Sequence, residues 1–413
     1  MKISRLLTFC VISVVLISCE NDEILNKTTP VFIEKIEGTV QKGPFLNGTS
    51  ITVSELNADF IQTGKVFNTQ IADSKGNFQF DRLELSTQYV ELKATGFYFN
   101  EITGKNSRSQ LTLYALSDLS DKSSLNINLL SHLERDRMFY LLSSGLSFNE
   151  AKKQAQKEIL NIFSFEMQDM LESELLDISK EGEDNAVLLA ISSIIQGNRT
   201  DAELSELLAN ISTDIREDGV LDNLTLGSEL LNHAKALNTS MVRENLISKY
   251  SEMGVEASIP DFQKYVSFFS DNSSFEYTGL VRFPVESDYG NNILNLDVTT
   301  LKAYTWYSLA ADLPEGTELK VVMKGGIWHN EILPNGPINW NFSLYDQIEE
   351  VQTFTSREPG KACDMRIKFI LPDGVPQEPF EWPDLIDSDT VTLEYFVNMS
   401  DVPSQEKTII IER

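Results

Sequence analysis

The sequence predicts a multidomain α+β protein in which a helical part lies between two β-rich parts. Short apolar runs that alternate with polar residues fill positions 35–118 and again 270–413, which is typical of half-buried strands. Between them, over 119–260, apolar residues recur at three- and four-residue intervals, as on the buried face of a helix. We therefore expect an N-terminal β-sandwich, a middle α-helical bundle and a C-terminal β-sandwich.

The composition excludes several classes of function. The chain has 34 Lys and Arg against 62 Asp and Glu, a formal charge of -28, so we expect no nucleic-acid partner, because phosphate recognition needs clustered cations. Three Cys and three His are too few for a disulfide framework or a zinc site. The sequence also lacks a phosphate-binding glycine-rich loop and a G-x-S-x-G nucleophile motif. We expect no cofactor and no enzymatic activity.

The first residues have the pattern of an export signal. Lys2 and Arg5 precede an apolar run over 6–17, which is shorter than the roughly 20 residues that span a bilayer but has the length of a signal-peptide core. The run ends in Leu-Ile-Ser-Cys at positions 16–19. The alternative interpretation is an uncleaved signal anchor with an incidental cysteine.

The motif at 16–19 resembles the lipobox of bacterial lipoproteins, in which the cysteine receives a diacylglycerol and the new amino group is acylated, for example with palmitate. The resemblance implies a signal peptide over 1–18, a lipid on Cys19, and a tether over 19–34 that joins the protein to the outer membrane. Several acyl chains on one residue anchor firmly. The acidic residues in 20–23 resemble a surface-export signal of bacterial lipoproteins, which implies exposure at the cell surface. Alternatively, they are a solvated linker.

The N-terminal β-rich part has turn residues between its apolar runs, including Gly43-Pro44 and Gly76-Asn77, as a β-sandwich requires. Three stretches, 38–53, 69–80 and 89–98, resemble the strand pattern of carboxypeptidase-regulatory-like, transthyretin-like modules. The resemblance implies a transthyretin-like β-sandwich over 35–118. It implies no particular activity, because such modules are mostly spacers or interaction domains beside a surface anchor.

The helical part contains clear start and stop signals. The stretches 147–150 and 200–203 have the spacing of a capping box, which predicts a helix start at each. The run 185–196 is apolar on nearly all sides and is followed by Gly197, which predicts a central helix that ends there. With the other apolar stripes, this indicates about six helices around a shared core. The acidic residues within 166–184 predict a solvated helix face.

The segment 214–222 partly resembles a calcium loop, because acidic residues stand at its first, fifth and ninth positions and a glycine at its sixth. Arg216 and Thr225 stand where an acceptor and a bidentate glutamate are expected. No metal site is therefore predicted, and the weak candidates are Asp214, Asp218 and Asp222. We favour a turn between two helices, in which Gly219 ends one helix and Asp222 or Asn223 caps the next.

The tryptophans all lie in the C-terminal part of the chain, at positions 306, 328, 340 and 382. An exposed ring can stack on the apolar face of a sugar while neighbouring amides bind its hydroxyls. The candidate ligand-binding residues are Trp340, with Asn339 and Asn341 beside it, and Trp382. The alternative is that tryptophans fill the sandwich core, which we favour for Trp306 and Trp328 and weigh evenly for the other two.

These observations favour an outer-membrane, surface-exposed lipoprotein with a non-catalytic binding or adhesion role toward a glycan or a protein. One alternative is a structural or assembly component of a cell-surface complex, with the helical part as the partner surface. Another is a carboxylate-based glycoside hydrolase, which needs two carboxylates about 5–10 Å apart in a cleft. The sequence does not predict the oligomeric state.

Overall fold

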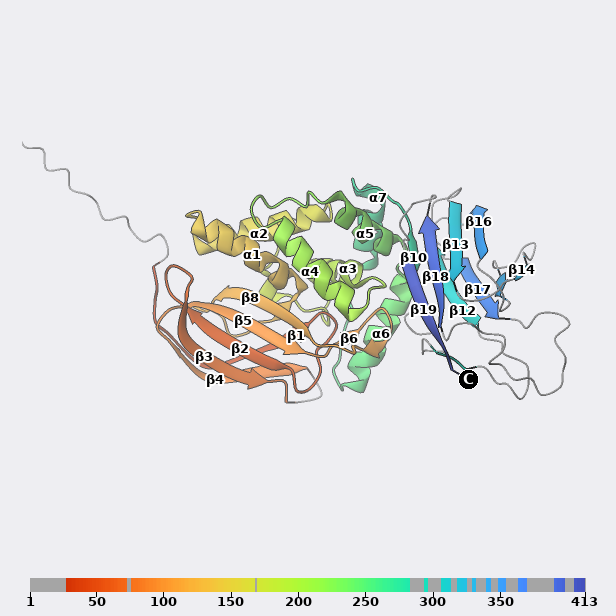
Figure 1. Cartoon of the computed structure of the whole chain (residues 1–413). Helices are drawn as coiled ribbons and strands as arrows, with labels where there is room; N and C mark the ends of the chain where they lie inside the picture. The colour runs from red at the N-terminus through yellow and green to blue at the C-terminus, as the bar shows by residue number, and fades with distance from the viewer. Residues whose placement is uncertain are drawn as a thin grey trace, which may run out of the picture.

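The computed structural model in Figure 1 describes residues 27–72, 76–167 and 169–282, and beyond them the backbone of nine strands between 293 and 412. The predicted signal peptide, Cys19 and Trp382 lie outside the described residues. Within them are seven α-helices and several sheets whose strand pairs are mostly antiparallel, which confirms the α+β class. None of the described helices is long and apolar enough to cross a bilayer.

Two sheets form the N-terminal part. The first has the order β4-β1-β9, with β1 antiparallel to β4 and parallel to the short β9. The second is antiparallel and has the order β3-β2-β5-β8, and β6 and β7 form a separate hairpin. The bounds are β1 Val31–Gln41, β2 Ser50–Leu56, β3 Gln62–Gln70, β4 Asn77–Leu85, β5 Tyr89–Gly96, β6 Phe99–Asn100, β7 Lys105–Asn106, β8 Leu111–Asp118 and β9 Ile127–Asn128.

Alternation along the strands places one face of each sheet in a common core. On β4, Phe78 and Phe80 are buried while Gln79 between them is exposed, as expected for successive side chains on opposite faces. Ile51 and Val53 of β2 belong to the same buried cluster. The two sheets therefore pack through a shared hydrophobic core.

Seven helices follow these sheets. Most of them lie along one side of the sheets, and α6 lies at one end beside β6 (Figure 1). The capping boxes predicted at Ser147 and Thr200 are both present, and they begin α2 and α4. The predicted central helix is α3, which ends at Gly197. The bounds are α1 Leu129–Ser143, α2 Phe148–Ile162, α3 Glu183–Gln196, α4 Asp201–Asp214, α5 Leu224–Lys235, α6 Thr239–Glu252 and α7 Gln263–Asn272, with a 3-10 turn at Ser173–Leu175.

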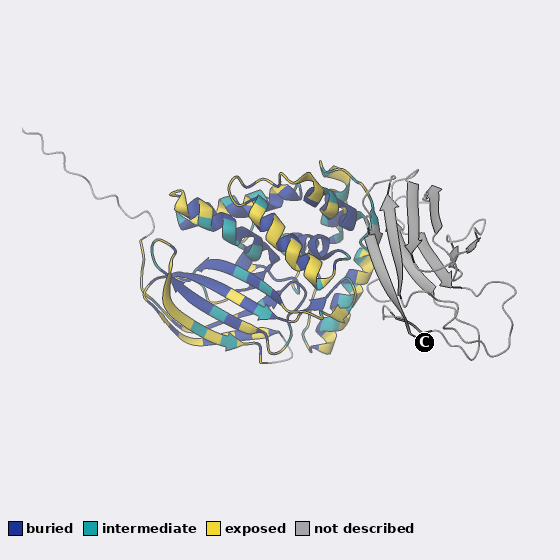
Figure 2. Cartoon of the chain, viewed as in Figure 1, coloured by how far each residue is buried: buried dark blue, intermediate teal, exposed yellow. Residues whose placement is uncertain are grey.

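The helices pack against the sheets and share a hydrophobic core with them. One continuous hydrophobic cluster contains strand residues such as Ile36 and helix residues such as Ile191 and Phe269. On the opposite face of the second sheet, Tyr89 packs on Phe148 of α2, with ring centroids 5.1 Å apart. Figure 2 shows buried residues continuing from the strands into the adjacent helices. The helical part thus covers the apolar face of the second sheet that does not pack on the first sheet.

Two features of this part differ from the sequence expectation. The prediction of a solvated helix face over 166–184 is wrong: the segment runs mostly as loop with one 3-10 turn, and Glu174 and Asp177 within it are buried. Helix α7 was not expected, because its N-cap residue Phe262 makes no side-chain capping bond. Burial of Phe269 and Val266 stabilises α7 in place of a cap.

Beyond residue 279, the described backbone forms two five-stranded sheets, of order β10-β12-β17-β15-β14 and β11-β19-β18-β13-β16. The apolar runs of the sequence predict strands at eight of these ten places, and β14 and β16 were not expected. The predicted strands are 277–283, 293–298, 305–309, 319–323, 339–344, 365–369, 390–396 and 408–411. The bounds are β10 Leu280–Arg282, β11 Ile293–Asn295, β12 Trp306–Asp312, β13 Glu318–Lys324, β14 His329–Glu331, β15 Asn339–Phe342, β16 Ile348–Thr353, β17 Cys363–Phe369, β18 Thr390–Val397 and β19 Gln405–Glu412.

Candidate functional site

A pocket of about 450 Å³ opens on the surface of the helical part. We call it the α1 pocket. Four of its residues lie on α1 at positions 136, 139, 140 and 143, a spacing that places them along one face of the helix. The loop between α4 and α5 contributes the other two. The lining residues are Asp136, Phe139, Tyr140, Ser143, Arg216 and Glu217.

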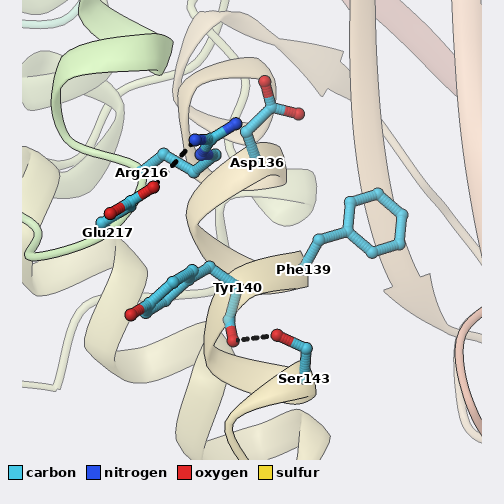
Figure 3. A pocket seen from close by; sticks show the side chains of 6 residues that line it. All are labelled: Asp136, Phe139, Tyr140, Ser143, Arg216 and Glu217. Atoms are coloured by element: carbon cyan, nitrogen blue, oxygen red, sulfur yellow. Dashed lines mark hydrogen bonds and ion pairs between the residues drawn. The ribbon is translucent and has the colours of Figure 1, made fainter.

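The charged and aromatic side chains of the α1 pocket are segregated. Figure 3 shows Asp136, Arg216 and Glu217 at one end and the two rings with Ser143 at the other. Arg216 Nη2 lies 2.9 Å from Glu217 Oε1, and both side chains are more than half exposed. Tyr140 is 38% exposed. The pocket thus presents hydrogen-bond donors, acceptors and accessible aromatic surface to solvent.

A buried arginine beneath the pocket holds the loop in place. Arg137 is 4% exposed and binds Glu158 of α2 through two bonds, Nε to Oε2 at 2.6 Å and Nη2 to Oε1 at 2.9 Å. Its Nη1 donates to the carbonyl oxygens of Glu217 at 2.6 Å and of Arg216 at 3.2 Å. Bidentate arginine–carboxylate pairs are strong and fix geometry. Arg137 therefore fixes the backbone from which the side chains of Arg216 and Glu217 project.

The same loop requires its glycine. Gly219 has a φ of +79°, a conformation that residues with a Cβ adopt at a cost. A Cβ at this position would lie 2.2 Å from the carboxyl carbon of Glu158, which is the partner of Arg137. The loop can approach α2 this closely only because no side chain is present.

Of the weak calcium candidates, Asp214 is the last residue of α4, and Asp218 and Asp222 lie in the loop that follows it. The carboxylates of Asp214 and Asp218 bind backbone amides. Asp214 Oδ1 accepts from the Asp222 N–H at 2.8 Å, and Asp218 Oδ1 accepts from the Val220 N–H at 3.0 Å. Asn223 caps α5, which is one of the two predicted alternatives, but α4 ends at Asp214 and not at Gly219 as predicted. Within the part of the chain that the structure describes, no group of three or more His, Cys, Asp or Glu side chains could hold a metal ion.

A second group of carboxylates lies in the core. Lys152 Nζ is 2.6 Å from Glu134 Oε2 and 2.5 Å from Glu174 Oε1, and both carboxylates are fully buried. Ser173 Oγ donates to Glu134. Neither glutamate lines the α1 pocket. The two buried carboxylates therefore share one ammonium group inside the fold.

Of the candidate residues around the tryptophans, the structure describes the backbone of three. Asn339, Trp340 and Asn341 lie together on β15, where Trp340 pairs with Asn330 of β14 and with Ile367 of β17. Their side chains lie outside the described residues, as does Trp382.

Sequence reasoning missed the α1 pocket, because helices α2, α3 and α4 lie between its two walls along the chain. The one signal was Arg216, which interrupts the calcium pattern and proves to be a pocket residue. The chain matches no family model, no curated protein and no solved structure.

Proposed function

We propose that this protein is an outer-membrane lipoprotein, anchored through Cys19 and exposed at the cell surface, that binds a glycan without transforming it. The proposed architecture is a transthyretin-like β-sandwich, a helical middle part and a C-terminal β-sandwich. The export motif at residues 16–19 supports the anchor, and the paired N-terminal sheets support the sandwich. The α1 pocket is the observation that carries the binding function.

The lining of the α1 pocket suits a sugar. The rings of Tyr140 and Phe139 offer apolar surface, against which the C–H face of a pyranose packs. Sugar hydroxyls can donate to the carboxylates of Asp136 and Glu217 and accept from the guanidinium of Arg216. Because the loop that carries Arg216 is held by Arg137, little ordering is needed on binding, which favours affinity.

The carboxylates of the pocket favour binding over hydrolysis. A glycosidase acid needs an environment that keeps it protonated, such as an apolar enclosure. Glu217 is 67% exposed and pairs with Arg216. Asp136 pairs with Arg135, with Nη1 and Oδ1 2.5 Å apart. Both groups are thus placed as hydrogen-bond acceptors in contact with water and cations.

Removing the exposed ring is expected to weaken glycan binding about tenfold. The full-length protein, purified in mild detergent, is first screened on a glycan array, and the affinity of the best glycan is then measured by calorimetry for wild type and Tyr140→Ala. The loss follows from the contact area of one aromatic ring, which contributes about 1–2 kcal/mol, and about 1.4 kcal/mol corresponds to a factor of ten.

The matched control is Phe268→Ala, which removes another exposed ring, 46% exposed and outside the pocket. We expect this control to bind as the wild type does. An array without any ligand, or equal affinities of wild type and Tyr140→Ala, contradicts the proposed site.

A further inference from the structure

A second pocket, of about 300 Å³, lies between the β6–β7 hairpin and α6. We call it the α6 pocket. Its lining has two lysines, two asparagines and one serine against one carboxylate, whereas the α1 pocket has one arginine against two carboxylates. Its lining residues are Phe99, Gly104, Lys105, Asn106, Asn245, Ser248, Lys249 and Glu252.

Lys249 occupies a fixed and partly desolvated position in this pocket. Its Nζ lies 5.3 Å from the centroid of the Phe99 ring, within the range of a cation–π contact, and its side chain is 15% exposed. Its described ion pair is with Glu252, which is 68% exposed and 3.8 Å away. Such a long surface pair contributes little. The ammonium charge is therefore available to a ligand and is strengthened by partial exclusion of water.

The two walls of the α6 pocket are joined by hydrogen bonds. Asn100 Oδ1 accepts from the N–H groups of Ile102 and Thr103 at 3.0 and 3.2 Å, which closes the hairpin turn. Across the pocket, Asn245 Nδ2 donates to the carbonyl oxygen of Glu101 at 3.0 Å and so joins α6 to the hairpin. Gly104 has a φ of +69°, and a Cβ there would lie 2.9 Å from Asn245 Oδ1. The cavity thus depends on a glycine in the turn.

We propose that the α6 pocket binds the carboxylate of a uronic acid residue, with Lys249 as the group that recognises the charge. The ammonium group bonds the carboxylate, while Ser248, Asn106 and Asn245 face the sugar hydroxyls. The volume is at the low end for ligand sites, so it suits one sugar ring. With a formal charge of -28 on the chain, a lysine-lined cavity is an exception to the acidic surface. This inference does not depend on the function of the α1 pocket.

The test measures uronate binding to the full-length protein in detergent by calorimetry. The probes are the methyl glycosides of galacturonate and glucuronate, their uncharged methyl esters, glucose and inorganic phosphate. We expect at least one uronate to bind saturably and its ester and glucose to bind at least tenfold more weakly, because a charge-assisted hydrogen bond contributes about 1.5–3 kcal/mol and about 1.4 kcal/mol is a factor of ten.

Two variants and two controls locate the site. Lys249→Gln should weaken uronate binding at least tenfold, and Lys249→Arg, which keeps the charge, should restore most of it. Lys65→Gln removes a lysine that also lies over a ring, Phe67, but belongs to β3, and it should bind as wild type does. Phe268→Ala, which removes an exposed ring outside both pockets, should also leave uronate binding unchanged.

Several results would overturn the proposal: no saturable binding of either uronate, equal binding of the methyl ester, tighter binding of phosphate than of the uronates, or an unchanged affinity in Lys249→Gln. Thermal unfolding of each variant shows whether the fold is retained. If Lys249→Gln does not fold, the ester comparison and Lys249→Arg still decide the outcome.

Discussion

Replacing Lys152 by methionine is expected to lower the free energy of unfolding by about 3–5 kcal/mol, because it leaves buried charge without its partner. Lys152 lies between Glu134 and Glu174, and the side chains of all three are at most 5% exposed. Burial by itself lowers the pKa of Lys152, but the two carboxylates outweigh burial and raise that pKa above its ordinary value. Urea denaturation near neutral pH measures the loss.

The loss caused by Lys152→Met should depend on pH. Burial raises the pKa of Glu134, and Lys152 opposes the rise, so the pKa rises further in the variant. A carboxyl group whose pKa is raised in the folded state favours folding when protonated and costs stability as the pH rises above its unfolded value of about 4.3. The difference from wild type should therefore be smaller near pH 5 than near pH 7.5.

Lys153→Met is the matched control, because this neighbouring lysine is exposed. We expect it to change the free energy of unfolding by no more than about 0.5 kcal/mol. A Lys152→Met variant as stable as this control, or one whose deficit grows toward acid pH, would contradict the account of the buried charges.

Replacing Cys19 by serine is expected to abolish lipid attachment altogether. If residues 16–19 are a lipobox, the thiol of Cys19 is the acceptor of the diacylglycerol, and a hydroxyl cannot replace it. Cells grown with labelled palmitate should incorporate the label into the wild-type chain and not into Cys19→Ser. Without several acyl chains the variant also loses its stable membrane attachment, so it should leave the membrane fraction or remain as the longer precursor.

The other two cysteines supply the controls for this labelling. Cys10 lies within the proposed signal peptide and Cys363 on β17, so Cys10→Ser and Cys363→Ser should both retain the label. If Cys19→Ser is labelled as strongly as the wild type, or if the wild type is not labelled, the proposed lipid anchor is contradicted.

Local signals in the sequence predicted local structure well. Ser147 with Glu150 and Thr200 with Glu203 specified two helix starts, because a capping box involves only neighbouring residues. Gly197 likewise ended α3. Alternation of apolar residues located most strands, since its two-residue period is also local. Strand β9 was missed because two residues are too few to show a period, and its Ile127 is specified by pairing with Val40 of β1.

Features that depend on distant residues were not predictable in this way. Glu174 was interpreted as part of a solvated acidic face, yet it is buried because Lys152 lies beside it. The α1 pocket needs Tyr140 on α1 and Arg216 on the α4–α5 loop to meet, and Arg137 joins these elements through backbone carbonyls that no side-chain pattern reveals. Tertiary contacts, rather than propensity or spacing, determine these sites.

The central claim is that the α1 pocket binds a glycan, and a crystal structure with the best array glycan tests it most directly. We predict a sugar ring against Tyr140, with its hydroxyls on Arg216 and Glu217. A glycan bound instead at the C-terminal strands beside Trp340, with the α1 pocket containing only water, would contradict the claim.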